Sequence, residues 1–238
     1  MNFKKYIPGR IKRTLKYLLG YNRERMDFLY TRSGDKIGNL QRDESIFLYG
    51  LIKVLRPKVV VEFGFLNGYS SSVILSAIGE ESRLYSYDIT EYSRDAASQF
   101  AKSHTNFFFH YKSQEEFDGS DIAEEFIDFV LIDASHDLEI NVATFEKITP
   151  FLTDDSLIMV HDTGVWEKKF MTAEHFETLN STENKWLDAK RVAHQINERR
   201  FINWIVENET DFVTLNFGSS AVLRHGFTLV GKKRMLET

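Results

Sequence analysis

The sequence contains no cysteine and only three prolines among its 238 residues. The absence of cysteine excludes disulfides, thiolate metal sites and cysteine nucleophiles, and it is compatible with a reducing cytoplasm, where we expect the protein to reside. No run of 18 apolar residues occurs, and the start lacks the apolar core of a signal peptide. The sequence therefore predicts neither a membrane-spanning helix nor a signal peptide. The net charge of −5 argues against general affinity for nucleic acid.

Short apolar runs alternate with helical patterns from residue 58 onward. Strands are expected at 58–61, 83–88, 106–111, 126–132, 156–160, 212–217 and 226–231, with helices at 71–78, 91–102, 141–151 and 189–207. Such alternation predicts an α/β fold in which helices cover both faces of a Rossmann-like, mostly parallel sheet. We therefore expect this fold to form one domain over 58–238. A helical extension over 1–57 precedes it, in which 43–55 is the segment with the clearest helical pattern.

Basic residues are concentrated in residues 1–25, which carry a local charge of +7. Ile11, Leu15, Leu18 and Leu19 form one helical stripe, so this segment predicts a basic amphipathic helix. Such a helix can lie peripherally on an anionic membrane, or it can pack on its own domain or on a partner subunit, as in a homo-oligomer. We favour packing, because four apolar residues offer little area for membrane burial.

A glycine turn follows the run of valines that forms the first strand. Glu62 comes first, then Gly64 and Gly68, then serines that can cap a helix. A strand, a glycine turn and a helix N-terminus together are typical of a nucleotide-cofactor cradle. The missing third glycine disfavours an NAD-type oxidoreductase, and the carboxylate of Glu62 suits a cationic ligand better than a pyrophosphate. The alternative is an ordinary turn between strand and helix.

An acid, Asp88, closes the second strand 20 residues after Gly68. An acid at this distance is placed to accept hydrogen bonds from ribose hydroxyls. The alternative is that Asp88 caps the next helix. The turn and the acid together favour a ribose-bearing cofactor.

Acids and imidazoles follow the fourth and fifth strands. Asp133, His161 and Asp162 offer oxygen, nitrogen and oxygen donors, which suit Mg²⁺, Mn²⁺ or a similar divalent ion. His136 could act as a general base. The alternatives are that Asp133 caps a helix and that His161 is a core imidazole.

Two motifs carry a resemblance to a known family over most of residues 58–166. Glu62-Phe63-Gly64, followed after three residues by Gly68, resembles the first motif of class I S-adenosylmethionine (SAM) methyltransferases. Residues 132–136 and 159–164 resemble metal-dependent O-methyltransferases related to macrolide-sugar methyltransferases, which have cephalosporin-hydroxylase-like proteins as near relatives. The resemblance implies a seven-stranded sheet whose last strand is antiparallel. It also implies Mg²⁺ bound through Asp133 and Asp162, although His161 stands where an acid is usual.

The resemblance further implies an activity and a set of site residues. We expect a SAM-dependent, divalent-metal-assisted O-methyltransferase that acts on a hydroxyl of a small-molecule or sugar-containing acceptor. The alternatives are an NAD-type oxidoreductase and a catalytically silent SAM-binding scaffold. Residues 165–188 form a candidate lid or acceptor pocket, or else a surface helix. The expected site residues are Glu62, Gly64, Gly68, Tyr69, Ser70, Asp88, Ser113, Gln114 and Asp133 for the cofactor, with Ser113 and Gln114 at the adenine; Asp133 and His136 for catalysis; and Asp133, His161 and Asp162 for the metal.

Overall fold

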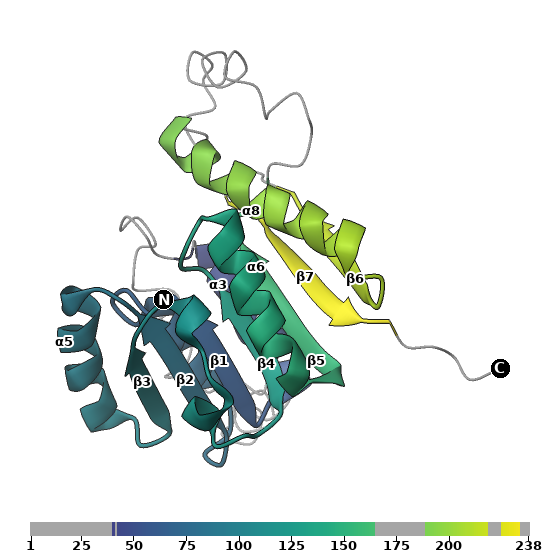
Figure 1. Ribbon diagram of the computed structural model, residues 1–238. Coiled ribbons are helices and arrows are strands. Elements are labelled where there is room, and N and C mark those ends of the chain that lie inside the picture. Colours follow the sequence, from purple (N-terminus) through teal and green to yellow (C-terminus); the bar gives the residue numbers. More distant parts are fainter. Residues whose placement is uncertain (1–39, 41, 165–188, 219–224, 234–238) are drawn as a thin grey trace, which may run out of the picture.

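The computed structural model describes residue 40 and residues 42–164, 189–218 and 225–233 (Figure 1). The basic helix predicted within residues 1–25 and the candidate lid at 165–188 lie outside the described residues. Across the part of the chain that is described, none of the helices has the length and apolar character needed to cross a membrane.

Seven strands form one sheet in the order β3-β2-β1-β4-β5-β7-β6. The first five pair in parallel, whereas β7 is antiparallel to both β5 and β6. The prediction of a mostly parallel sheet whose last strand is antiparallel is therefore confirmed. The strands are β1 (Val59–Phe63), β2 (Arg83–Asp88), β3 (Phe107–Tyr111), β4 (Ile127–Ile132), β5 (Leu152–His161), β6 (Phe212–Phe217) and β7 (Phe227–Lys232).

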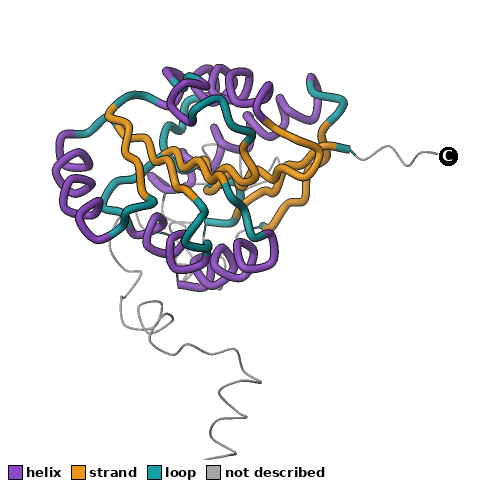
Figure 2. The backbone as a smooth tube through the Cα atoms, turned by 90° about the horizontal axis from the view of Figure 1, so that it is seen from below, coloured by secondary structure: helices purple, strands orange, loops and turns teal. Residues whose placement is uncertain are grey.

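Helices cover both faces of the sheet, as Figure 2 shows. They are α3 (Arg42–Leu55), α4 (Tyr69–Ala77), α5 (Glu91–Phe100), α6 (Leu138–Ile148) and α8 (Ala189–Asn208). Alternate residues of β1 point to opposite faces: Val59 and Val61 join the core beneath α6 and α8, and Val60 joins the core beneath α3, α4 and α5. The two apolar cores fix the sheet between its helices, so the carboxyl ends of β1, β2, β4 and β5 meet at one edge.

Strand β1 runs two residues further than the sequence suggested, through Glu62 to Phe63. Phe63 pairs with Tyr87 on one side and Ile132 on the other, so β1 is a fully hydrogen-bonded central strand. Glu62 therefore lies inside the strand and is buried, not at the strand end as expected. The strand tolerates this carboxyl group because the hydroxyls of Ser71 and Ser86 donate hydrogen bonds to it. Strand β5 likewise begins at Leu152, four residues before its predicted start.

Candidate functional site

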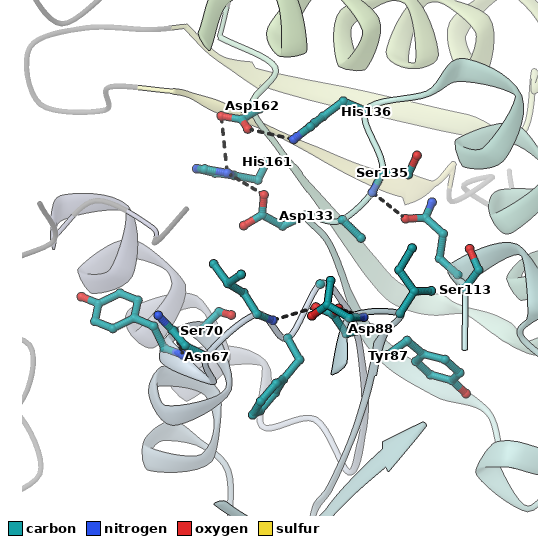
Figure 3. Close-up of a pocket in the computed structure, with 18 of the residues that line it drawn as sticks. Asn67, Ser70, Tyr87, Asp88, Ser113, Asp133, Ser135, His136, His161 and Asp162 are labelled. Carbon is teal, nitrogen blue, oxygen red and sulfur yellow. Dashed lines mark hydrogen bonds and ion pairs between the residues drawn. The ribbon is translucent and has the colours of Figure 1, made fainter. Parts of the chain in front are cut away.

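A cavity of about 470 Å³ opens at the carboxyl ends of β1, β2, β4 and β5 (Figure 3). Ten of the predicted site residues line it, whereas Glu62 and Gly68 do not. The ten are Gly64, Tyr69, Ser70, Asp88, Ser113, Gln114, Asp133, His136, His161 and Asp162. One continuous cavity thus joins the glycine turn to the cluster of acids and imidazoles.

Gly64 and Gly68 shape the turn after β1 in different ways. Gly64 has φ +103°, and a Cβ atom there would lie 2.1 Å from the backbone oxygen of Asp133. Only glycine allows the two chain segments to approach this closely. Gly68, with φ +76°, is the N-cap of α4 and faces the ring of Phe65. Gly64 therefore brings the cradle against Asp133, and Gly68 lets the helix start.

Asp88 connects two turns at the end of β2. One carboxylate oxygen accepts a hydrogen bond from the Leu66 backbone N–H at 2.8 Å, and the other accepts from the Thr90 N–H at 2.9 Å. The N-cap of α5 is Thr90, whose hydroxyl oxygen accepts from the Ser93 N–H. Asp88 lines the cavity and, as a carboxylate, retains further acceptor capacity for a ligand.

Glu62 lies behind the cradle and is fully buried. Burial raises the pKa of its carboxyl group to about 7, against the lowering effect of the hydroxyls of Ser70, Ser71 and Ser86. Its Oε1 atom has no hydrogen-bond partner among the described residues. Ser70 lines the cavity and its hydroxyl lowers the pKa of Glu62, so the buried carboxyl group lies close to the ligand space.

This buried carboxyl group predicts a pH dependence of stability that a Glu62→Gln variant should lack. The pKa of Glu62 is higher in the folded than in the unfolded protein, so the folded state binds a proton more tightly and loses relative stability as the pH rises toward and through 7. Between pH 5 and 8 the free energy of unfolding of the wild type should fall by roughly 2–3 kcal/mol relative to the variant. Urea unfolding at both pH values measures this.

An exposed acid provides the control for that measurement. Glu146 lies on the solvent side of α6, and Glu146→Gln should leave the pH profile of the wild type unchanged. If Glu62→Gln and the wild type lose stability in parallel between pH 5 and 8, Glu62 does not titrate as its burial implies.

The structure brings Asp133, His161 and Asp162 together (Figure 3), and their donor atoms lie within 4.8 Å of one another. His161 Nδ1 is 3.1 Å from Asp133 Oδ1 and 3.6 Å from Asp162 Oδ1. His161 Nε2 faces the Oε2 atom of Glu44 at 3.1 Å. Burial lowers the pKa of His161, but the three carboxylates outweigh it and hold the pKa well above its ordinary value. The cluster therefore attracts positive charge.

Asp162 adopts a left-handed backbone conformation, with φ +59°. Its Oδ2 atom is 3.8 Å from His136 Nε2, and its Oδ1 atom is 3.2 Å from His225 Nδ1. Oδ1 is buried and has no hydrogen bond among the described residues. An unsatisfied buried carboxylate oxygen is costly, and a cation beside it would remove that cost. Together with the donor set of the cluster, this oxygen shows that the residues present fit a divalent cation.

His136 is held by a hydrogen-bond network that crosses three elements. Its Nδ1 atom is 3.0 Å from Oε1 of Glu198 on α8, and the other oxygen of Glu198 accepts from the Asn141 side chain at 2.9 Å. Asn141 accepts from Gln114 at 2.7 Å, and Gln114 in turn accepts from the Ser135 N–H at 3.0 Å. The side-chain amide of Gln114 thus serves this network, although Gln114 also lines the cavity.

The charges around His136 set its protonation. Burial lowers its pKa, but the hydrogen bond to Glu198 and the charges of Asp162, Glu198 and Asp133 raise it above the ordinary value. Burial raises the pKa of Glu198 to about 7, although its hydrogen bonds to His136 and Asn141 oppose the rise. A proton is therefore readily held on this pair.

Arg199 anchors α8 beside the site. Its guanidinium group donates to the Thr163 carbonyl oxygen, just after β5, and to Asn216 at 2.8 Å. Burial lowers its pKa to about 10. Since Arg199 follows Glu198 directly, this anchor keeps Glu198 within reach of His136.

Three polar residues that contact the cluster or His136 were not foreseen from the sequence: Glu44, Glu198 and His225. The first two carried a signal, because each acid shares a helical stripe with buried apolar residues, Glu44 with Leu48 and Glu198 with Ile202. An acid on a buried stripe requires a partner. His225 carried no comparable signal, because it precedes β7 in an irregular segment.

Known proteins share this domain and fold. Residues 61–163 match a family model described as a methyltransferase domain. Tapetum-specific methyltransferase 1 of Arabidopsis thaliana is 32% identical over 72 residues, which cover 28% of this chain and 31% of that protein. The match thus spans about a third of the length of this curated relative.

Solved structures resemble the whole chain at low sequence identity. A Podospora anserina methyltransferase bound to S-adenosylhomocysteine (SAH) has a TM-score of 0.66 at 13% identity and covers 98% of both chains. TomG, an O-methyltransferase of Streptomyces achromogenes in complex with SAM, has a TM-score of 0.62 at 16% identity and covers 94% of this chain and 96% of its own. The family match includes most of the segments that line the cavity, and the fold agrees with it. Residues 61–163 therefore match a methyltransferase domain, and the whole chain has the fold of these solved methyltransferases.

Proposed function

We propose that the protein transfers the methyl group of SAM to a hydroxyl group of a small-molecule or sugar-containing acceptor, with assistance from a divalent cation. The observation that carries this proposal is the shared cavity, which joins the glycine cradle and Asp88 to the Asp133–His161–Asp162 cluster. A methyl donor at the cradle and a hydroxyl at the cluster would therefore lie side by side, and such positioning supplies much of the acceleration in group transfer.

The cradle would hold the two ends of SAM. Asp88 offers carboxylate oxygens to the ribose hydroxyls, and the turn at Gly64 approaches the methionine part without a side chain in between. Ser70, supported by the buried Glu62, would face the cationic end of methionine. Ser113 and Gln114 also line the cavity, and the adenine would lie beside them.

Methyl transfer would proceed as a single displacement. The acceptor oxygen forms a bond to the methyl carbon while the carbon–sulfur bond breaks, and the sulfur keeps the electron pair. The hydroxyl proton then needs a base, and His136 would take it. Neutral His136 that donates Nδ1–H to Glu198 would carry its lone pair on Nε2, the atom that faces Asp162. Buried Glu198 would also stabilise the imidazolium that results.

Asp133, His161 and Asp162 would hold the divalent cation, which the family resemblance gives as Mg²⁺. When bound, such a cation acts as a Lewis acid that lowers the pKa of an acceptor hydroxyl. The carboxylates of Asp133 and Asp162 come from the ends of adjacent strands, so the sheet itself sets their separation.

Direct binding and turnover measurements test the proposal. Calorimetry with SAM and with NAD should show binding of SAM alone. Hydroxylated compounds are then screened with methyl-labelled SAM, with divalent cation and with EDTA, and transfer to a hydroxyl is expected only with the cation. Binding of NAD in place of SAM would favour the oxidoreductase. SAM binding without transfer to any acceptor would favour a silent scaffold.

Asp88→Ala is expected to weaken SAM binding by about 1.5–3 kcal/mol, the usual worth of a hydrogen bond to a charged group. The variant also frees the N–H groups of Leu66 and Thr90, so the turn around the ribose loses its shared acceptor. Calorimetric titration of the folded variant with SAM measures the loss. Asp95→Ala, at an exposed position on α5, is the control. Unchanged SAM affinity in Asp88→Ala would remove Asp88 from the cofactor site.

A further inference from the structure

Glu44 connects two segments that both carry an imidazole. It lies on α3, is fully buried, and uses its two carboxylate oxygens for different partners. Oε2 faces His161 Nε2 at 3.1 Å. Oε1 accepts from the backbone N–H groups of His225 at 2.9 Å and Gly226 at 3.2 Å. One acid thus positions the end of β5 and the start of β7 together.

The contact with Glu44 determines which nitrogen of His161 faces the cluster. The carboxylate of Glu44 holds a proton on Nε2, so a cation at the cluster would displace the proton on Nδ1, the atom that faces Asp133 and Asp162. An imidazole whose outer N–H is held by a buried carboxylate is the usual arrangement of a histidine that binds a metal. His161 therefore has the orientation of a ligand.

His225 is held at the same cluster by its backbone. Its N–H donates to Glu44, and its carbonyl oxygen accepts from the Gly164 N–H at 2.9 Å. Gly226 permits this approach, because a Cβ atom there would lie 2.5 Å from the Gly164 Cα. The ring of His225 lines the cavity, with Nδ1 at 3.2 Å from Asp162 Oδ1, the oxygen that lacks a hydrogen bond.

We propose that His225 is a fourth ligand of the cation site, and that Glu44 organises the two imidazoles, so that the site prefers Co²⁺, Zn²⁺ or a similar transition ion over Mg²⁺. The inference rests on the proposed function, whose cation site it specifies. Two imidazoles and two carboxylates form a mixed nitrogen and oxygen donor set. Imidazole suits transition ions, whereas Mg²⁺ requires oxygen ligands in near-octahedral geometry.

Metal binding is measured on the full-length chain after removal of metal with EDTA and dialysis. Calorimetry with Co²⁺ and with Mg²⁺ should give at least tenfold tighter binding of Co²⁺. The visible absorption of bound Co²⁺ reports directly on its ligands and does not depend on turnover. His225→Ala should change this spectrum and reduce the Co²⁺ affinity, whereas His225→Asp, which supplies an oxygen donor, should shift the preference toward Mg²⁺.

Glu44→Gln tests the positioning role separately. The backbone N–H groups of His225 and Gly226 require the amide oxygen, so the amide NH₂ would face His161 Nε2 and move the proton of His161 to Nδ1. The Co²⁺ affinity should fall by about 10–100-fold, the usual effect of removing the partner of a ligand. His104→Ala, whose Nδ1 contacts the Phe100 carbonyl oxygen away from the cavity, is the matched control.

Each outcome decides between the alternatives. If His225→Ala and His225→Asp both keep the Co²⁺ spectrum and affinity of the wild type, His225 is not a ligand. If the wild type binds Mg²⁺ as tightly as Co²⁺, the site has no preference for transition ions. Unchanged Co²⁺ affinity in Glu44→Gln would overturn its role. Circular dichroism confirms that each variant is folded. A site with the expected Co²⁺ properties, but with no methyl transfer to any acceptor, would sustain this inference and count against the proposed function.

Discussion

His136→Asn is expected to slow methyl transfer by roughly 10²–10⁴-fold, the usual contribution of a general base, while SAM and cation binding stay close to those of the wild type. The asparagine amide can still donate to Oε1 of Glu198, as Nδ1 of His136 does at 3.0 Å. It has no counterpart of Nε2, the atom proposed to receive the proton. Single-turnover rates with an acceptor found by screening, together with calorimetry for SAM, measure the two effects.

His136→Ala gives a useful contrast. Its rate should fall as in His136→Asn, but its stability should fall further, because buried Glu198 loses a hydrogen-bond partner. His104→Ala should leave the rate unchanged, since His104 does not line the cavity. Normal turnover in His136→Asn would return His136 to a structural role, in which it holds α8 against the loop after β4.

The residues that meet at one edge of the sheet could be predicted from the sequence, because strands that alternate with helices form a parallel sheet. Parallel strands joined by helices place all their carboxyl ends at one edge, so Asp88, Asp133 and Asp162 had to approach one another. Gly64 was recognisable because a turn between strand and helix that passes another segment requires glycine. These inferences need only local pattern and the handedness of the crossover connections.

Contacts between distant segments could not be predicted in the same way. Glu44 lies 117 residues before His161, and its partner depends on where α3 packs. Glu198 reaches His136 across 62 residues because α8 lies beside α6. Periodicity indicates which helical face is buried, but it does not indicate which loop that face meets. The acids on buried stripes could therefore have indicated that partners exist, but not which ones.

The position of Glu62 illustrates a related limit. Its sequence context, a charged residue after three valines, suggested the end of a strand. The strand continues because Phe63 fits between Tyr87 and Ile132, and because two serines donate hydrogen bonds to one oxygen of the buried carboxyl group. Those serines lie on α4 and β2, so the tolerance for an acid inside the strand comes from tertiary packing, not from the local sequence.

Asp162→Asn is expected to abolish cation-dependent methyl transfer and to weaken cation binding by more than the 10–100-fold that follows removal of a ligand's partner. The carboxylate charge at the cluster is lost, including the oxygen that lacks a hydrogen bond in this structure. Asparagine is the appropriate replacement, because it tolerates the left-handed backbone at φ +59°, whereas alanine would add strain to the loss of the ligand. Calorimetry with Co²⁺ and Mg²⁺ and rates with and without EDTA measure both effects.

The control for this variant is Asp154→Asn, at an exposed position on β5, the strand that Asp162 follows, which should change neither cation binding nor rate. SAM affinity in Asp162→Asn should stay near the wild-type value, because the cradle and Asp88 are on other strands. That separation distinguishes a lost cation site from a collapsed cavity, in which SAM binding would fail as well. If the wild type turns over at full rate in EDTA, or if Asp162→Asn retains cation-dependent transfer, the cation has no role through Asp162, and the carboxylate serves instead to hold His136, His161 and His225 in place.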